Sequence, residues 1–330
     1  METSGYRFHV QFHITNRCNL RCRHCYEGAQ RGIIEWELNE FKQAIEKLWA
    51  CFSKWGVQGE ISLIGGEPTL HPLFYKMVEY LHQRGDVTAI SILTNGVYLD
   101  DSFINKMKDY NCFVQVSIDG NSQKQHDFIR GDGTFSKTLT NARALSQAGI
   151  PVSAHCVLSR YTYPITEELF QVLDENGVSQ LAFSRLVPFG NAKSSDMLSS
   201  QELKDTYSFI RTMAQKYGNS GLHVAATRPL WCTIDEMLGG FCPAGIQTIT
   251  ILENGDIMPC RRLPIVIGNI KSDSFYRIWY TNSVLENLRN REKIKQCNHC
   301  SYLKHCGGAR CIAYATSGDY MAEDPQCWIK

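Results

Sequence analysis

Apolar and polar residues alternate in short segments along the first half of the chain. In residues 6–14, apolar side chains occupy every second position, which is the period of a β-strand. Residues 38–52 instead place apolar side chains every three or four positions, a pattern that predicts a helix. Residues 59–65 form a short apolar run between glycines, which is typical of a buried strand. Together they make one strand–helix–strand unit.

The same unit then repeats. Further strands are predicted at residues 87–93, 112–118, 152–158 and 178–186. Helices are predicted at residues 72–83, 99–110, 135–147 and 165–175. About six strands alternating with helices indicate a parallel sheet with right-handed crossovers, and they are too few to close an eight-stranded barrel. We therefore expect an α/β protein with a partial (β/α)6 TIM-type barrel, whose open side could admit a large substrate.

The pattern changes near residue 189. Residues 190–200 are polar, residues 201–217 have the period of a helix, and cysteines become frequent beyond Trp231. An Asn-Gly pair at 254–255 lies between two short apolar segments, 248–252 and 256–258, which predicts a hairpin. We expect a barrel at 1–188, a linker and bridging helix at 189–231, and a cysteine-rich module at 232–330. A module that small needs metal clusters or other cross-links for stability.

Composition narrows the class of protein. The formal net charge is +1, and acidic and basic residues are mixed throughout, so neither nucleic acid nor an anionic membrane is expected as the main partner. The N-terminus lacks the basic and apolar regions of a signal peptide, which predicts a cytoplasmic protein. In that reducing compartment 14 cysteines indicate metal binding rather than disulfides. Cys51, Cys112 and Cys156 lie within helix or strand patterns and are expected in the core.

Three further cysteines follow the first strand directly. Cys18, Cys22 and Cys25 have the spacing CxxxCxxC. A four-iron cluster normally takes four thiolates, so three of them leave one iron free to bind a ligand that is not protein. The alternative is a structural zinc site, but such sites usually have four ligands in paired spacings that this segment does not match.

Gly65-Gly66-Glu67-Pro68 follows the second strand. Adjacent glycines let a small ligand lie against bare backbone, and a neighbouring carboxylate can receive an ammonium group. A tight turn is the alternative explanation of the glycine pair. Because both this segment and the cysteine segment follow the carboxyl ends of strands, we expect them on the face where barrel enzymes form their sites.

Together the two motifs closely resemble the radical S-adenosylmethionine (AdoMet) superfamily. The resemblance implies that Cys18, Cys22 and Cys25 hold a 4Fe-4S cluster whose open iron binds the amino and carboxylate groups of AdoMet. It implies AdoMet contacts for Gly65, Gly66, Glu67, Pro68, Thr94, Asn95, Ser117 and Asp119. A side chain at Gly66 is then expected to weaken AdoMet binding without removing iron. Residues 126–131 match a further family segment, and His24 is expected either near the adenine or facing solvent. No catalytic residue is identified.

The C-terminal cysteines resemble a SPASM module, which in the family carries two auxiliary 4Fe-4S clusters. The resemblance assigns Cys232, Cys242, Cys260 and Cys311 to one cluster and Cys297, Cys300, Cys306 and Cys327 to the other. The chain would then hold three 4Fe-4S clusters. One departure is that four residues separate Cys306 from Cys311 where the family usually has three. A zinc ribbon is the alternative for the pair Cys297 and Cys300 alone.

Family members with this module mostly modify ribosomal peptides or proteins, and a minority act on haem precursors or other small molecules. We therefore expect an enzyme that cleaves AdoMet reductively and abstracts hydrogen from a precursor peptide, installing a crosslink, thioether, epimer or backbone excision. A haem- or cofactor-biosynthetic enzyme is the first alternative. A non-catalytic iron–sulfur electron carrier or sensor is the second, and it has no use for an AdoMet pocket.

Arg261 and Arg262 follow Cys260, where the sulfatase-maturing branch has an aspartate, so that branch is not expected. The two arginines could receive acidic side chains of a leader peptide, or could be ordinary surface charge. Because the first strand starts near residue 6, we expect peptide recognition to need a separate small protein. A flavodoxin- or ferredoxin-type donor is expected to supply electrons.

Overall fold

The computed structural model of the chain describes residues 7–28, 32–226 and 228–329. Within them one sheet contains ten strands. Its centre is a run of parallel strands in chain order: β1 (Arg7–Thr15), β2 (Gln58–Gly65), β3 (Val87–Thr94), β4 (Phe113–Ser117), β5 (Val152–Leu158) and β6 (Gln180–Arg185). The predicted partial (β/α)6 barrel is confirmed.

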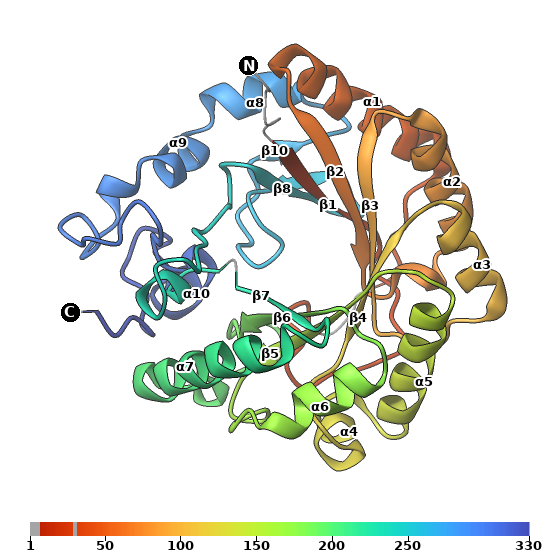
Figure 1. Ribbon diagram of the computed structural model, residues 1–330. Helices are drawn as coiled ribbons and strands as arrows, with labels where there is room; N and C mark the ends of the chain where they lie inside the picture. The colour runs from red at the N-terminus through yellow and green to blue at the C-terminus, as the bar shows by residue number, and fades with distance from the viewer. Residues whose placement is uncertain (1–6, 29–31, 227, 330) are drawn as a thin grey trace.

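Helices connect successive strands and cover the outside of the sheet (Figure 1). They are α1 (Leu38–Trp55), α2 (Phe74–Arg84), α3 (Asp101–Asp109), α5 (Thr134–Gln147), α6 (Glu167–Glu175) and α7 (Ser200–Tyr217). The sequence pattern did not predict α4 (Gln123–Arg130), a short helix between β4 and α5. Its apolar positions are too few for a helical period to stand out.

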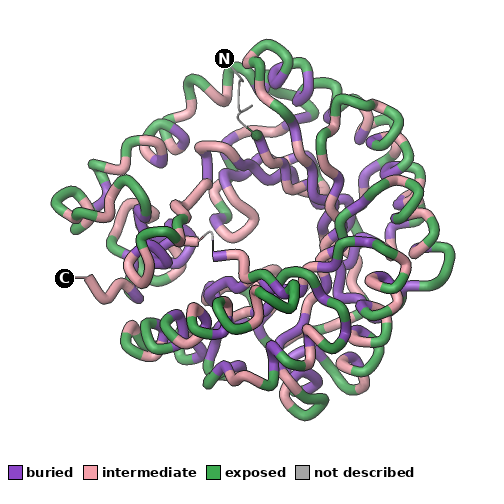
Figure 2. The backbone as a smooth tube through the Cα atoms, viewed as in Figure 1, coloured by how far each residue is buried: buried purple, intermediate pink, exposed green. Residues whose placement is uncertain are grey.

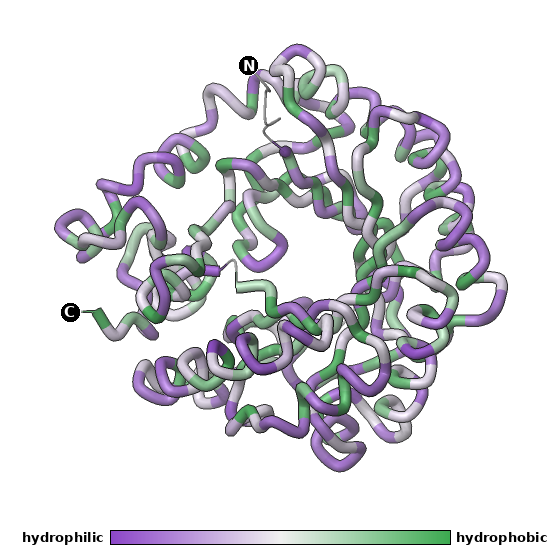
Figure 3. The backbone as a smooth tube through the Cα atoms, in the orientation of Figure 1, coloured by the Kyte–Doolittle hydropathy of each residue, from purple (hydrophilic) through white to green (hydrophobic). Residues whose placement is uncertain are grey.

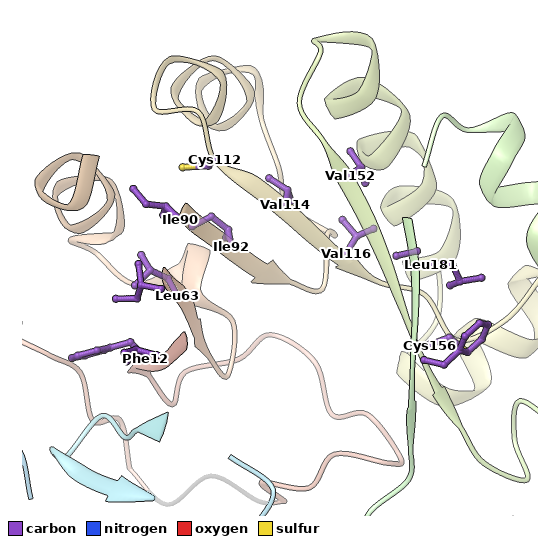
Figure 4. Packing of buried hydrophobic residues seen from close by; sticks show 14 of the residues in the cluster. Phe12, Leu63, Ile90, Ile92, Cys112, Val114, Val116, Val152, Cys156 and Leu181 are labelled. Atoms are coloured by element: carbon purple, nitrogen blue, oxygen red, sulfur yellow. The ribbon is translucent and has the colours of Figure 1, made fainter. Parts of the chain in front are cut away.

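The core lies between the sheet and these helices. Phe8, Val10, Phe12 and Ile14 of β1 are at most 1% exposed, so the alternation in the sequence marks the face that the helices cover. Figure 4 shows apolar side chains of β2 to β6 on the same face of the sheet. Cys51, Cys112 and Cys156 are buried in this core, as predicted. The opposite face of the strands is mostly polar and lines the inside of the barrel.

The helices have exposed polar outer surfaces and buried inner ones, as Figures 2 and 3 show. α1 illustrates how the sequence produces this, because Phe41, Ile45, Leu48 and Phe52 repeat along one stripe and are all buried. Gly56 ends the helix in a left-handed conformation, with φ of 65°. No helix in the described part of the chain is long and apolar enough to cross a membrane.

The C-terminal part continues the same sheet. It contains β7 (His223–Ala225), β8 (Thr248–Ile251), β9 (Asp256–Met258), β10 (Gly268–Asn269), α8 (Phe275–Thr281), α9 (Ser283–Arg289) and α10 (Arg310–Ser317). Short 3-10 turns lie at Pro68–Leu70 (η1), Ser194–Asp196 (η2), Trp231–Thr233 (η3) and Arg291–Lys293 (η4).

The predicted hairpin is present as β8 and β9, which pair antiparallel. Its β8 strand also pairs in parallel with β1, and β7 pairs with β6, so the sheet extends beyond the barrel at both ends. The indole nitrogen of Trp36 donates to the carbonyl of Leu252 at 3.1 Å and fixes the hairpin further. The domain boundaries expected at residues 188 and 231 stay a prediction. The β1–β8 and β6–β7 pairings join the parts on either side of them.

Candidate AdoMet and iron–sulfur sites

A cavity of about 170 Å³ lies at the carboxyl ends of β1 to β5. Of the residues that the sequence assigned to AdoMet or its cluster, it is lined by Cys18, Cys22, Cys25, Gly65, Gly66, Thr94, Asn95 and Ser117. These come from the ends of three strands, β2, β3 and β4, and from the loop that follows β1. The structure therefore brings together the cysteine segment and most of the predicted AdoMet contacts.

The glycine pair is fixed by the backbone beside it. The amide of Gly66 donates to the carbonyl of Thr15 at 2.9 Å, and the amide of Glu67 donates to the carbonyl of Arg17 at 2.7 Å. A Cβ on Gly66 would lie 2.4 Å from the Arg17 oxygen, and one on Gly65 would lie 2.2 Å from the Thr15 oxygen. The sequence argument assigned the glycines to ligand space. The structure shows that close packing against the chain entering Cys18 already requires them.

Glu67 does not line the cavity. Its carboxylate is buried and accepts hydrogen bonds from the Thr69 hydroxyl, the Thr94 hydroxyl and the Asn95 amide, each at 2.7 Å. Burial raises the pKa of Glu67, while these hydrogen bonds act in the opposite direction. Glu67 therefore links the loops after β2 and β3, and Pro68, next to it, starts the 3-10 turn η1. A direct contact of either residue with AdoMet stays a prediction.

Asp119 also bonds to protein groups rather than lining the cavity. Its carboxylate accepts from His24 Nε2 at 2.7 Å, Arg130 Nε at 2.6 Å and the Val157 amide at 2.7 Å. Burial alone would raise the pKa of Asp119, but Arg130, His24 and the Val157 amide hold it well below its usual value. This carboxylate ties the cysteine segment to α4 and β5.

His24 is buried and faces Asp119, so of its two expected positions the one in solvent is wrong. Sequence reasoning missed two other neighbours of the cysteines. Arg130 lines the cavity, with Nη1 4.0 Å from Cys22 Sγ. Asn191 donates through its amide to the Cys25 carbonyl at 2.8 Å and through its side chain to the Cys22 carbonyl at 3.0 Å. The family segment at 126–131 was the only signal for Arg130, and a polar stretch gave none for Asn191.

The three thiols suit a cluster that supplies positive charge. Burial raises the pKa of all three, that of Cys18 to about 12, so a cation is needed to stabilise them as thiolates. Among the described residues, no three Cys, His, Asp or Glu side chains lie close enough together to hold a single metal ion. The fit to a 4Fe-4S cluster therefore rests on the donor set and the shared cavity.

The C-terminal cysteines fall into two groups. Cys297, Cys300, Cys306 and Cys327 line a small cavity of about 20 Å³. Cys242, Cys260 and Cys311 form the other group, in which burial and the neighbouring thiols raise the pKa of Cys311 to about 12. Seven of the eight predicted ligands therefore lie in the two sets that the resemblance assigned.

A family model described as the radical SAM superfamily matches residues 12–183, more than half of the chain. The chain belongs to the radical SAM superfamily. A second model, SPASM, described as an iron-sulfur cluster-binding domain, matches residues 242–301. These two domains imply AdoMet and 4Fe-4S clusters as the cofactors of this radical SAM protein.

Similar proteins have more than one activity. An AdoMet-dependent heme synthase from Methanosarcina barkeri is 28% identical, over 96% of this chain and 95% of that protein. Mycofactocin maturase MftC from Mycobacterium tuberculosis is 27% identical, over 96% of this chain and 82% of that protein. The fold resembles that of Streptococcus suis SuiB bound to S-adenosylmethionine, with a TM-score of 0.80 at 18% identity, covering 98% of this chain and 78% of that one.

Cys232 lies beside a cysteine of the set to which the SPASM resemblance did not assign it. Its pKa is raised to about 12 by burial and by Cys306 and Cys300, which belong to the other group. Cys306 in turn accepts from the amides of Leu230 and Gly308 at 3.3 and 3.4 Å. The assignment of Cys232 to the Cys242, Cys260 and Cys311 cluster stays a prediction.

A buried ion pair joins the cysteine-rich C-terminal part of this radical SAM protein to the barrel. We call this part, residues 232–330, the SPASM end. Arg185 at the end of β6 contacts both carboxylate oxygens of Asp324, at 2.7 and 3.0 Å. Asp324 also accepts from the Ala309 amide at 2.7 Å. Burial alone would raise the pKa of Asp324, but Arg185 and the Ala309 amide hold it below its usual value. The pair fixes the segments that carry Cys306, Cys311 and Cys327.

Proposed function

We propose that this radical SAM/SPASM protein abstracts a hydrogen atom from an organic substrate held in the barrel. The observation that carries the proposal is the single cavity shared by Cys18, Cys22, Cys25 and the glycine pair. When bound, a cluster with an open iron supplies the electron that cleaves AdoMet to methionine and the 5′-deoxyadenosyl radical. The protein's part is to orient AdoMet through the strand-end loops and to keep water out.

The first substrate candidate is a ribosomally made precursor peptide, which would receive a crosslink, thioether, epimer or backbone excision. The maturase among the relatives supports this candidate. A separate peptide-recognition protein and a flavodoxin- or ferredoxin-type electron donor belong to the same proposal. Tethering a leader peptide on such a partner would raise the effective concentration of its core segment at the barrel.

The second candidate is a haem precursor. Its specific support is the AdoMet-dependent heme synthase, which matches this chain over nearly the whole length of both proteins. A tetrapyrrole carries propionate groups, whereas a precursor peptide carries carboxylates only where its sequence provides Asp or Glu. The two candidates therefore differ in a way that an assay can separate.

The test starts from anaerobically reconstituted protein with dithionite and AdoMet. We expect about twelve irons per chain if three four-iron clusters form, and slow release of 5′-deoxyadenosine. The Cys18/Cys22/Cys25→Ala variant should lose about a third of the iron and release no 5′-deoxyadenosine, because the cluster beside the AdoMet cavity is gone. Cys51→Ala is the matched control, since Cys51 lies in the core contributed by α1.

Substrate is then identified by mass spectrometry. A precursor peptide encoded beside the gene, with and without a co-encoded recognition protein, forms one set of reactions, and iron coproporphyrin III forms the other. A mass change dependent on AdoMet identifies the substrate class. A fully loaded protein that releases no 5′-deoxyadenosine with any reductant or substrate would support a non-catalytic role. Stoichiometric zinc with about four irons would contradict the auxiliary clusters.

A further inference from the structure

A second cavity, of about 330 Å³, occupies the inside of the barrel. Polar side chains from the inner face of the strands line much of it, including His9, Gln11 and Ser62. Its wall includes Leu93, Gln115 and Arg261, which also line the AdoMet cavity. The two cavities are therefore neighbours, and a molecule in the second would lie next to the site of radical formation.

Two arginines, Arg228 and Arg261, line this inner cavity. Within the described residues neither side chain lies within ion-pair distance of a carboxylate. Basic side chains elsewhere in the described part of the chain make fourteen contacts of that kind. Glu60 is the one acidic residue in the cavity wall, and Arg7 already contacts it at 2.8 Å. Both arginines are half-buried, and a charge that is partly removed from water is stabilised by a counter-charge.

The other titratable groups around the cavity do not supply the missing negative charge. Burial lowers the pKa of His9 to about 4 and that of His13 to about 3, and the charge of Arg261 acts in the same direction. Burial also holds the pKa of His155 well below its usual value. Glu27 contacts His13 at 3.3 Å and lies within ion-pair distance of neither arginine. The inner cavity therefore combines two cations with mostly neutral polar groups.

A different arginine is placed to neutralise the neighbouring thiolates. The amide of Arg262 donates to the Cys260 sulfur at 3.5 Å, so this residue lies beside a predicted cluster ligand. It lines neither cavity, and its Nη1 donates to the Arg185 carbonyl at 3.4 Å. Arg262 is therefore the comparison that separates a cluster role from a cavity role.

We propose that Arg228 and Arg261 bind a carboxylate of the substrate inside the barrel. The inference rests on the proposed function and adds to it that the substrate is an acid. The same chemistry is offered by a tetrapyrrole propionate and by an acidic side chain of a peptide. A guanidinium suits this role because it presents its donors in a fixed planar arrangement that matches a carboxylate.

Binding is measured by anaerobic titration of the reconstituted full chain, without reductant, so that activity is not the readout. One probe is iron coproporphyrin III, with its methyl ester as the neutral counterpart. The other is a glutamate-containing precursor peptide, with its glutamine counterpart. Hydrogen bonds to charged groups are worth about 1.5–3 kcal/mol, so Arg228→Gln and Arg261→Gln should each weaken binding of the acidic probe by about tenfold or more.

Arg262→Gln should leave that affinity within about twofold and instead change the electron paramagnetic resonance spectrum of the SPASM clusters. The proposal is supported if the protein prefers an acidic probe over its neutral counterpart and both cavity variants lose that preference. The probe pair that shows the preference, porphyrin or peptide, identifies the source of the carboxylate. Equal binding of acid and neutral probes, or unchanged affinity in both variants, overturns it. Release of 5′-deoxyadenosine is scored separately, so failure of the radical reaction is distinguished from failure of carboxylate binding.

Discussion

At the scale of the residue, Gly66 affects both the AdoMet cavity and the position of the first cluster ligand. Its amide bonds to the Thr15 carbonyl, and a Cβ there would approach the Arg17 carbonyl to 2.4 Å. That carbonyl belongs to the residue before Cys18 and is backbone, so it cannot move aside as a flexible side chain could. Space for AdoMet and the position of the first cluster ligand are thus coupled at Gly66.

We expect Gly66→Ala to lose both AdoMet affinity and the iron of the first cluster, about a third of the total if three four-iron clusters form. The ligand-space argument from sequence predicts loss of AdoMet affinity alone. Iron content and an AdoMet dissociation constant, measured on the same anaerobic preparation, distinguish the two. Gly239→Ala is the control, because a Cβ at Gly239 would meet no atom within 4 Å. Full iron with weakened AdoMet binding would restore the simpler explanation.

At the scale of the element, Asp119 joins parts of the barrel that are distant in sequence. Its carboxylate follows β4 and accepts from the cysteine segment, from α4 and from β5. It is fully buried, and so are most of the groups that it contacts. A carboxylate in this position orients these elements, and its contact with AdoMet stays a prediction.

Asp119→Asn should lower the free energy of unfolding by about 3–5 kcal/mol, since removing one partner leaves Arg130 buried without its counter-charge. Anaerobic denaturant unfolding measures the effect, and iron analysis should show partial loss from the first cluster. The control is Arg160→Gln, which breaks an ion pair with Glu202 in which the arginine is 52% exposed and should cost less than about 1 kcal/mol. Equal stability of the two variants would contradict the role given to Asp119.

At the scale of the whole molecule, two of the contacts between the SPASM end and the barrel show how the parts are joined. Strand β8 pairs with β1, and Arg185 of β6 pairs with Asp324. The second contact lies close to the cysteines that are predicted to hold the auxiliary clusters. The stability of those clusters and the integrity of the barrel are therefore linked.

Asp324→Asn should reduce the iron of the SPASM clusters and speed proteolysis of the C-terminal segment, because the Arg185 charge loses its partner and the Ala309 amide is held less tightly. The first cluster and basal release of 5′-deoxyadenosine should persist. Mass spectrometry of proteolytic fragments, together with iron content, measures both effects. Lys295→Gln removes an exposed ion pair in the same region and should change neither. Loss of the first cluster in Asp324→Asn would show that the two ends do not fail separately.

The sequence by itself determined the order of the six barrel strands and of the helices between them except α4, the AdoMet cluster motif and most of the auxiliary cysteines. Each depends on spacing within a short segment, such as the alternation in β1 or the interval between Cys18 and Cys25. Local periodicity survives folding because it reflects which face each element must bury.

Only the tertiary structure decided which distant residues meet. It turned Glu67 and Asp119 toward protein donors, placed Cys232 beside Cys306, paired β8 with β1 and directed Arg228 and Arg261 into the barrel. These outcomes depend on strand register and on competition among polar groups for buried partners that come from different elements. No spacing in the chain encodes that competition, because its partners come together only when the sheet closes around them.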